Sequence, residues 1–144
     1  MLYSTYRKPR KLSKKLLEET LTFAQDYLDL PYNTYVNIEY LSQESELHFG
    51  FCMDMDKKEL EYSIEINRNT SIEQMTATLF HELVHVKQYI DGRLVSGEGR
   101  SPSTWFGIPI YEEYDNQPWE VEAYALEKEM VKEFMFERRI PIGH

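Results

Sequence analysis

The first half of the chain changes from a helical to a strand-like pattern of apolar residues. Over residues 12–29 the apolar side chains recur at steps of three and four, which predicts a helix that Ser13 caps and Pro31 ends. Residues 33–67 instead alternate apolar and polar side chains. Polar turns at 42–45 and 54–58 divide this stretch into three runs, which predict a three-stranded antiparallel meander: 35–41, 47–51 and 62–67.

The second half contains two helical patterns separated by a stretch rich in glycine and proline. Residues 71–90 have helical spacing and end before Gly92. They begin at a capping-box pattern, which is either Thr70 with Glu73 or Ser71 with Gln74. Residues 91–118 predict a long irregular loop, a kind of segment that can cover a substrate. Residues 119–138 predict the last helix. We therefore expect one α+β domain over residues 1–144, with an N-terminal helix, a three-stranded antiparallel sheet, a second helix, a loop and a third helix.

The predicted helix 71–90 carries two histidines one turn apart. On a helical wheel of about 100° per residue, its apolar positions gather on one side, and His81 and His85 fall on the other. Both imidazoles should therefore point away from the core on which the apolar side packs. Residues four apart have Cβ atoms about 5–6 Å from each other, which lets two imidazoles converge on one tetrahedral zinc ion.

A catalytic zinc site needs a third protein ligand and one open position. The other histidines of the chain lie before this helix or at the C-terminus, so a glutamate on the last helix is the better candidate. Glu120 is preferred, because it borders the apolar side of that helix and because Ala123, one turn later, permits a close approach between helices. Glu122, directed further towards solvent, is the second candidate, and Glu127 is the third.

These residues resemble a known arrangement. His81-Glu82-Leu83-Val84-His85 followed by Glu120-Val121-Glu122-Ala123 is similar to the gluzincin type of zincin metallopeptidase, with two histidines on one helix and a glutamate on the next. The wider pattern is similar to small phage and bacterial SprT-like metallopeptidases. Three further segments carry this similarity: 105–107, 111–114 and 118–120. The resemblance covers residues 71–127, and its most specific part is the motif at 81–85.

The resemblance implies a minimal zincin-like fold that binds Zn²⁺ and hydrolyses peptide bonds in a peptide or protein substrate. It makes His81, His85 and Glu120 the metal ligands, with Glu122 as the alternative to Glu120. Glu82 would be the catalytic residue, which polarises the metal-bound water and carries a proton to the leaving amine.

The resemblance also suggests where a substrate would bind. In such folds the strand nearest the metal is an edge strand to which a peptide can add, and we expect residues 62–67 to be that strand. Tyr111 and Tyr114 are candidate hydrogen-bond donors to the oxyanion. Tyr124 stands where many gluzincins have Asp or Asn, so the contact that orients the metal-binding histidines must come from elsewhere.

The charge of the chain bears on its partners. The formal net charge of −9 disfavours broad binding to nucleic-acid phosphates. One basic cluster departs from this balance, and we interpret it as the solvated start of a helix: Arg7, Lys8, Arg10, Lys11, Lys14 and Lys15. SprT and Spartan-type proteins use a third histidine and are associated with DNA. A DNA-associated SprT-like protease therefore stays as an alternative, with this cluster as its support.

The single cysteine and the apolar runs of the chain bear on its compartment, and one more functional alternative stays open. Cys52 is the single cysteine and lies in an apolar run, which predicts a buried thiol and no disulfide within the chain. Neither a secretory signal nor a membrane span is expected, so we expect the cytoplasm, or the host cytoplasm if the protein is phage-encoded. The other alternative is a catalytically silent zincin-fold binding or regulatory module, although the presence of Glu82 favours the enzyme. The oligomeric state is not predicted.

Overall fold

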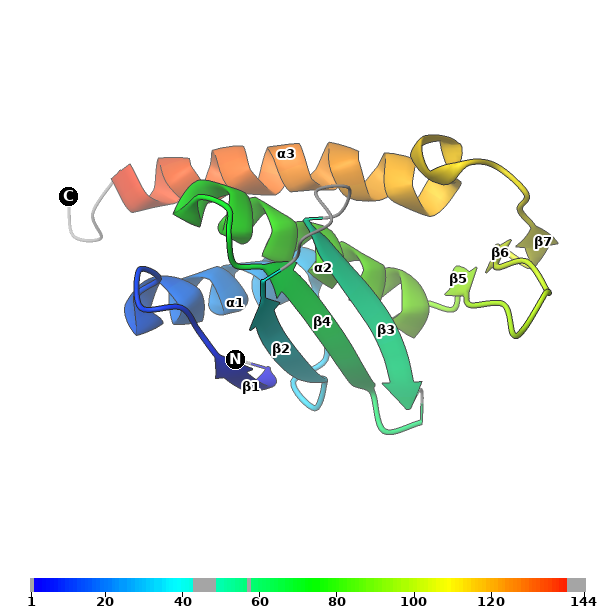
Figure 1. The fold of residues 1–144 in the computed structure, drawn as a ribbon, viewed down its shortest axis with the longest axis horizontal. Helices are drawn as coiled ribbons and strands as arrows, with labels where there is room; N and C mark the ends of the chain where they lie inside the picture. The colour runs from blue at the N-terminus through cyan, green and yellow to red at the C-terminus, as the bar shows by residue number, and fades with distance from the viewer. Residues whose placement is uncertain (1, 43–48, 57, 140–144) are drawn as a thin grey trace.

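The computed structural model describes residues 2–42, 49–56 and 58–139 and has the predicted α+β class. The helices are α1 (Lys14–Leu28), α2 (Ile72–Ile90), α3 (Pro118–Arg139) and the 3₁₀ turn η1 (Tyr114–Asn116). The main sheet contains β1 (Tyr3–Arg7), β2 (Tyr35–Leu41), β3 (Gly50–Asp56) and β4 (Glu61–Asn67). A small antiparallel sheet contains β5 (Leu94–Val95), β6 (Thr104–Trp105) and β7 (Ile108–Pro109). Figure 1 shows the helices on one side of the main sheet, which α2 contacts directly.

The main sheet differs from the predicted three-stranded antiparallel meander. Its order is β1-β2-β4-β3, in which β1, β2 and β4 are parallel and β3 runs antiparallel beside β4. Helix α1 connects β1 to β2, and a crossover of this kind joins parallel neighbours. Strand β1 was not predicted, because Tyr3–Arg7 has its two aromatic residues three apart and shows no alternation of apolar and polar side chains. The predicted antiparallel order is wrong because alternation identifies a strand without identifying its neighbour.

Strand β3 is longer than predicted and lies elsewhere in the sheet. The strand predicted at 47–51 occupies Gly50–Asp56, and residues 47 and 48 lie outside the described part of the chain. The turn predicted to begin at Asp54 is wrong, because the strand continues through an irregularity between Asp54 and Asp56. The expectation that 62–67 is the edge strand is also wrong, since β4 lies inside the sheet and β3 forms its edge.

The helices agree with the predicted segments because their signals are local. The Ser13 hydroxyl accepts a hydrogen bond from the Leu16 N–H at 3.0 Å, and the Ser71 hydroxyl accepts one from the Gln74 N–H at 3.0 Å. The predicted irregular segment 91–118 is mostly without regular structure but contains the small sheet and η1.

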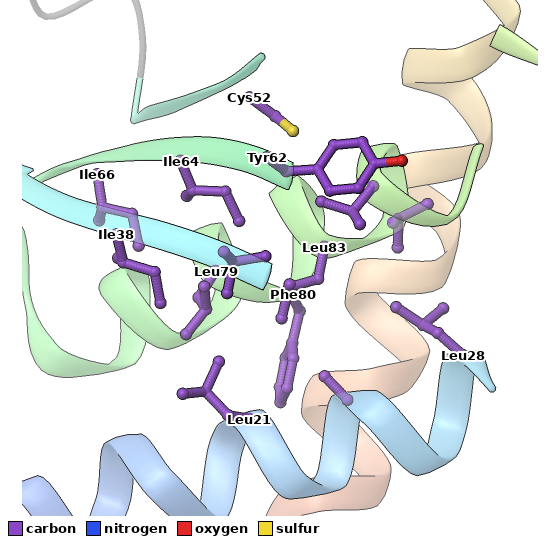
Figure 2. Packing of buried hydrophobic residues seen from close by; sticks show 14 of the residues in the cluster. Leu21, Leu28, Ile38, Cys52, Tyr62, Ile64, Ile66, Leu79, Phe80 and Leu83 are labelled. Carbon is purple, nitrogen blue, oxygen red and sulfur yellow. The ribbon is translucent and has the colours of Figure 1, made fainter. Parts of the chain in front are cut away.

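The core lies between the main sheet and the helices. Alternate residues of β2 and β4 are buried against α2, together with Cys52 of β3, as Figure 2 shows. On its other side α2 contacts α1 and α3 through three aromatic rings whose centroids lie 5.2–5.5 Å apart: Phe23, Phe80 and Phe134. Helix α2 is therefore buried on both sides, and its two histidines face α3 rather than solvent. The buried sheet residues are Val36, Ile38, Tyr40, Tyr62, Ile64 and Ile66.

The basic cluster only partly matches its interpretation as a helix start. Arg7 ends β1, and only Lys14 and Lys15 belong to α1. Lys11 donates a hydrogen bond to the Thr70 carbonyl at 2.6 Å, just before α2. Within residues 2–42, 49–56 and 58–139, no helix is long and apolar enough to cross a membrane.

Candidate metal centre

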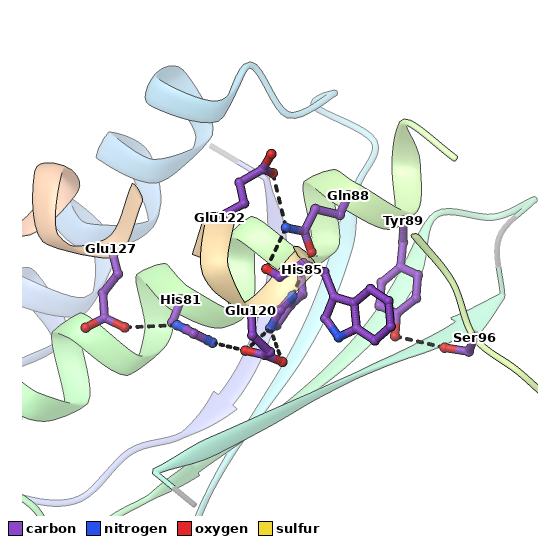
Figure 3. Close-up of polar contacts among 9 residues, drawn as sticks. His81, His85, Gln88, Tyr89, Ser96, Glu120, Glu122 and Glu127 are labelled. Atoms are coloured by element: carbon purple, nitrogen blue, oxygen red, sulfur yellow. Dashed lines mark hydrogen bonds and ion pairs between the residues drawn. The ribbon is translucent and has the colours of Figure 1, made fainter. Parts of the chain in front are cut away.

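Two histidines from α2 meet one glutamate from α3. His81 Nε2 lies 2.8 Å from Glu120 Oε1, and His85 Nε2 lies 3.1 Å from Glu120 Oε2. All three side chains are buried, and their potential ligand atoms lie within 4.8 Å of one another (Figure 3). This group, with two imidazole nitrogens and one carboxylate, could hold a metal ion.

Local structure explains this convergence. His81 and His85 are four residues apart on one face of α2, so both rings project in the same direction. Helix α3 begins at Pro118, which places Glu120 in its first turn, and the fully buried Ala123 lies one turn later. The small side chain at 123 allows α3 to lie close to α2, so that the Glu120 carboxylate reaches both imidazoles.

The contacts between the histidines and Glu120 shift the pKa values of these groups in opposite directions. Burial lowers the pKa of the His81 imidazole, but hydrogen bonds with Glu120 and Glu127 outweigh this effect and raise the pKa to about 9. Burial raises the pKa of the Glu120 carboxyl, but hydrogen bonds with His81 and His85 prevail and lower it to about 2. A buried carboxylate is thus stabilised by positive charge at the position where a cation would bind.

Each of the two histidines is held by a second contact at its other ring nitrogen. His81 Nδ1 lies 3.0 Å from Glu127 Oε1, and His85 Nδ1 lies 2.7 Å from Gln88 Oε1. Because these oxygens can only accept hydrogen bonds, Nδ1 donates in both pairs and Nε2 is directed at Glu120. The ring of Tyr124 lies against His81, with the centroids 4.5 Å apart. The contacts that orient His81 and His85 therefore come from Glu127 and Gln88, and Tyr124 makes only a ring contact with His81.

Glu122 takes part in a neighbouring network rather than facing solvent as predicted. Both of its carboxylate oxygens accept hydrogen bonds from Arg93, at 2.8 and 2.7 Å, and one accepts from the Gln88 amide at 3.1 Å. The same amide donates to the Trp119 carbonyl at 3.0 Å. Glu122 thus fixes Gln88, which in turn orients His85, and it lies outside the group of three potential ligands.

Glu82 lies in the same cleft as His85 and Glu120 but is not one of the three potential ligands. It is buried, and burial raises the pKa of its carboxyl to about 7. Strand β3 passes close above it: a Cβ added at Gly50 would lie 3.1 Å from Glu82 Oε2 and 2.5 Å from Thr78 Cγ2. A carboxyl with a pKa near neutrality can both take up and release a proton, which suits it to general acid–base chemistry. Gly50 keeps the space above it open.

The site opens into a cleft of about 770 Å³. One wall is β3, the floor includes Glu82, His85 and Glu120, and the opposite wall comes from the segment between α2 and α3. Within that wall, Arg93 lies over the Trp105 ring at 5.1 Å. The wall is anchored to α2 by the Tyr89 hydroxyl, which is hydrogen-bonded to the Ser96 hydroxyl at 2.9 Å. The sequence analysis predicted the segment 91–118, which contains this wall, only as a long irregular loop.

The two candidate tyrosines have different positions. Tyr114 lines the cleft, where burial and a hydrogen bond to Tyr124 raise the pKa of its hydroxyl. Tyr111 is 83% exposed and does not line the cleft. Only Tyr114 is therefore near enough to the site to serve as the donor suggested from the sequence.

Comparisons of the chain with family models, with curated proteins and with solved structures find no match. The resemblance to zincins therefore stays a prediction based on residues 81–85 and 120–123. What the structure adds is a buried group of two histidines and a glutamate beside a second, separate glutamate in a cleft.

Proposed function

We propose that the chain is a zinc-dependent peptidase. The observation that carries the proposal is the buried group of His81, His85 and Glu120, with Glu82 beside it in a cleft at a sheet edge. Two imidazoles and one carboxylate form a donor set that suits zinc and leaves a coordination position open. A metal held only for stability would need a fourth protein ligand, and the group of potential ligands in the described residues contains three.

In the proposed reaction, a bound zinc ion would activate water and Glu82 would transfer the proton. A bound zinc ion supplies a Lewis acid that makes water acidic near neutral pH. Glu82 takes the proton from the water whose oxygen attacks the peptide carbonyl carbon. As the carbon–nitrogen bond breaks, Glu82 returns the proton to the departing amine. The pKa of about 7 suits both transfers.

Strand β3 is the element to which a peptide substrate would add. It is the edge of the main sheet, and its residues 50–54 line the cleft that contains Glu82 and Glu120. Backbone hydrogen bonds to an edge strand hold a peptide extended and fix its register. A substrate held in this way would carry its scissile bond past Glu82, and Tyr114, which also lines the cleft, is the proposed donor to the oxyanion.

Metal analysis combined with a peptide-library assay tests the proposal. We expect about one zinc ion per chain, cleavage of a subset of peptides, loss of cleavage on chelation and its return when zinc is added. Stoichiometric zinc without cleavage of any peptide would instead support the silent binding module. A chain that binds no zinc would refute both.

Removal of the orienting carboxylate should weaken metal binding without abolishing it. We expect Glu127→Ala to lower zinc affinity about 10–100-fold, because His81 loses the acceptor that holds its Nδ1–H. Glu127→Gln should lose less, since its amide oxygen can still accept that hydrogen bond. Competition with a chromogenic chelator measures the affinities. Glu133→Ala on the exposed side of the same helix is the control, and an effect as large in this variant would show that the loss is not specific to the contact with His81.

A further inference from the structure

The outer face of the main sheet is mixed on β2 and polar on β4. It carries Tyr35, Asn37, Glu39 and Leu41 on β2, and Ser63 and Glu65 on β4. On β3 it carries Phe51 and Met53, which pair with Glu65 and Ser63 of β4. The intervening Cys52 points the other way, into the core. Phe51 and Met53 therefore expose apolar surface and have polar rather than apolar neighbours on β4.

These two residues belong to the strand that forms one wall of the cleft. Phe51 is 52% and Met53 is 44% exposed, and both line the cleft that contains Glu82, His85 and Glu120. An exposed apolar edge strand is an aggregation hazard unless something covers it. Its continuity with the candidate site indicates that the covering partner is the molecule that the site binds.

We infer that the preferred substrates are extended segments with apolar side chains at alternate positions, an inference that rests on the proposed peptidase function. A chain that pairs with the free edge of β3 directs every second side chain to the outer face of the sheet. Apolar residues at those positions would cover Phe51 and Met53 and form cross-strand pairs with them. Phe51 and Met53 are then specificity-determining residues and not catalytic ones.

A second copy of this chain is a less favourable partner for the same strand. The formal net charge of −9 opposes the association of two copies. Pairing of two β3 strands would also close the cleft that β3 lines. A short extended peptide meets neither obstacle.

Two peptides of identical composition test the inference. In one, leucine and serine alternate, and in the other the leucines are grouped together. We expect wild-type protein to cleave the alternating peptide with the higher kcat/KM. The double variant Phe51→Thr/Met53→Thr should reduce that value between about twofold and about thirtyfold, as expected for the loss of two cross-strand pairs. Its turnover of the grouped peptide should change much less.

The matched control uses the same substitutions on another surface. Met135 and Phe136 on α3 are 42% and 61% exposed, close to the values for Met53 and Phe51, and do not line the cleft. Met135→Thr/Phe136→Thr should leave both kcat/KM values unchanged. Threonine favours strands, so the β3 variant should also keep its fold, which circular dichroism checks.

A binding arm separates failure of the inference from failure of the proposed function. Fluorescence anisotropy with the labelled peptides and the Glu82→Gln protein measures recognition without turnover. Weaker binding of the alternating peptide by Glu82→Gln protein that also carries the β3 substitutions would support the inference even if nothing is cleaved. Cleavage that ignores both peptide order and the β3 substitutions would overturn the inference and leave the peptidase proposal standing. Self-association that the β3 substitutions abolish, without peptide binding, would overturn it in favour of a second copy.

Discussion

Glu82→Gln is expected to keep about one zinc ion per chain and to reduce kcat for peptide cleavage by about 10²–10⁴-fold, the usual contribution of a general acid–base group. The amide has nearly the volume of the carboxyl but cannot take up a proton from water. Glu82 is not among the three potential metal ligands, so zinc content should not change. Atomic absorption on the purified variant, together with steady-state kinetics on a cleaved peptide, measures both quantities.

The stability of this variant should not explain its loss of activity. Burial raises the pKa of the Glu82 carboxyl, which means that the buried site disfavours the ionised form. Removal of the charge should therefore leave the Tm unchanged or raise it. Glu73→Gln makes the same substitution in the exposed first turn of α2 and should retain full kcat. Equal turnover by wild type and Glu82→Gln would refute the assigned role.

Sequence patterns predicted the features of this chain that depend on neighbours within one turn or one strand. The Ser13 and Ser71 caps are examples, since each hydroxyl accepts from an N–H three residues later. The shared face of His81 and His85 is another, because it follows from helical geometry alone. The sheet order could not be predicted in this way. The insertion of β4 between β2 and β3 depends on pairing that alternation does not encode.

The residues around the candidate metal site could be predicted only in part. Glu120 lies 39 residues after His81, and it could be proposed only because Ala123 and the apolar side of α3 suggested how the two helices pack. The role of Glu127 had a signal that the sequence analysis did not use: it follows Glu120 by two turns and so lies on the same face of α3. Gln88 follows His85 by one turn and had a similar signal. Gly50 had none, because its position above Glu82 depends on the edge strand.

Glu120→Ala is expected to lower zinc affinity by more than about 100-fold, beyond the range typical for loss of an orienting contact. The substitution removes the only carboxylate in the group of potential ligands and leaves two imidazoles, which cannot complete a three-ligand site. Peptide cleavage should be lost with the metal. Competition with a chelator measures the affinity, and cleavage is assayed at zinc concentrations below and above that of the protein.

Glu122→Ala is the variant that makes this prediction decisive, because both glutamates lie in the first two turns of α3. Glu122 contacts Arg93 and Gln88, so its loss should loosen the support of His85 and reduce zinc affinity much less than Glu120→Ala does. Glu120→Gln keeps the buried volume and one oxygen acceptor but removes the charge that both imidazoles contact. It should therefore fold like wild type and still bind zinc poorly. Wild-type zinc affinity in Glu120→Ala together with a large loss in Glu122→Ala would reassign the third ligand to Glu122.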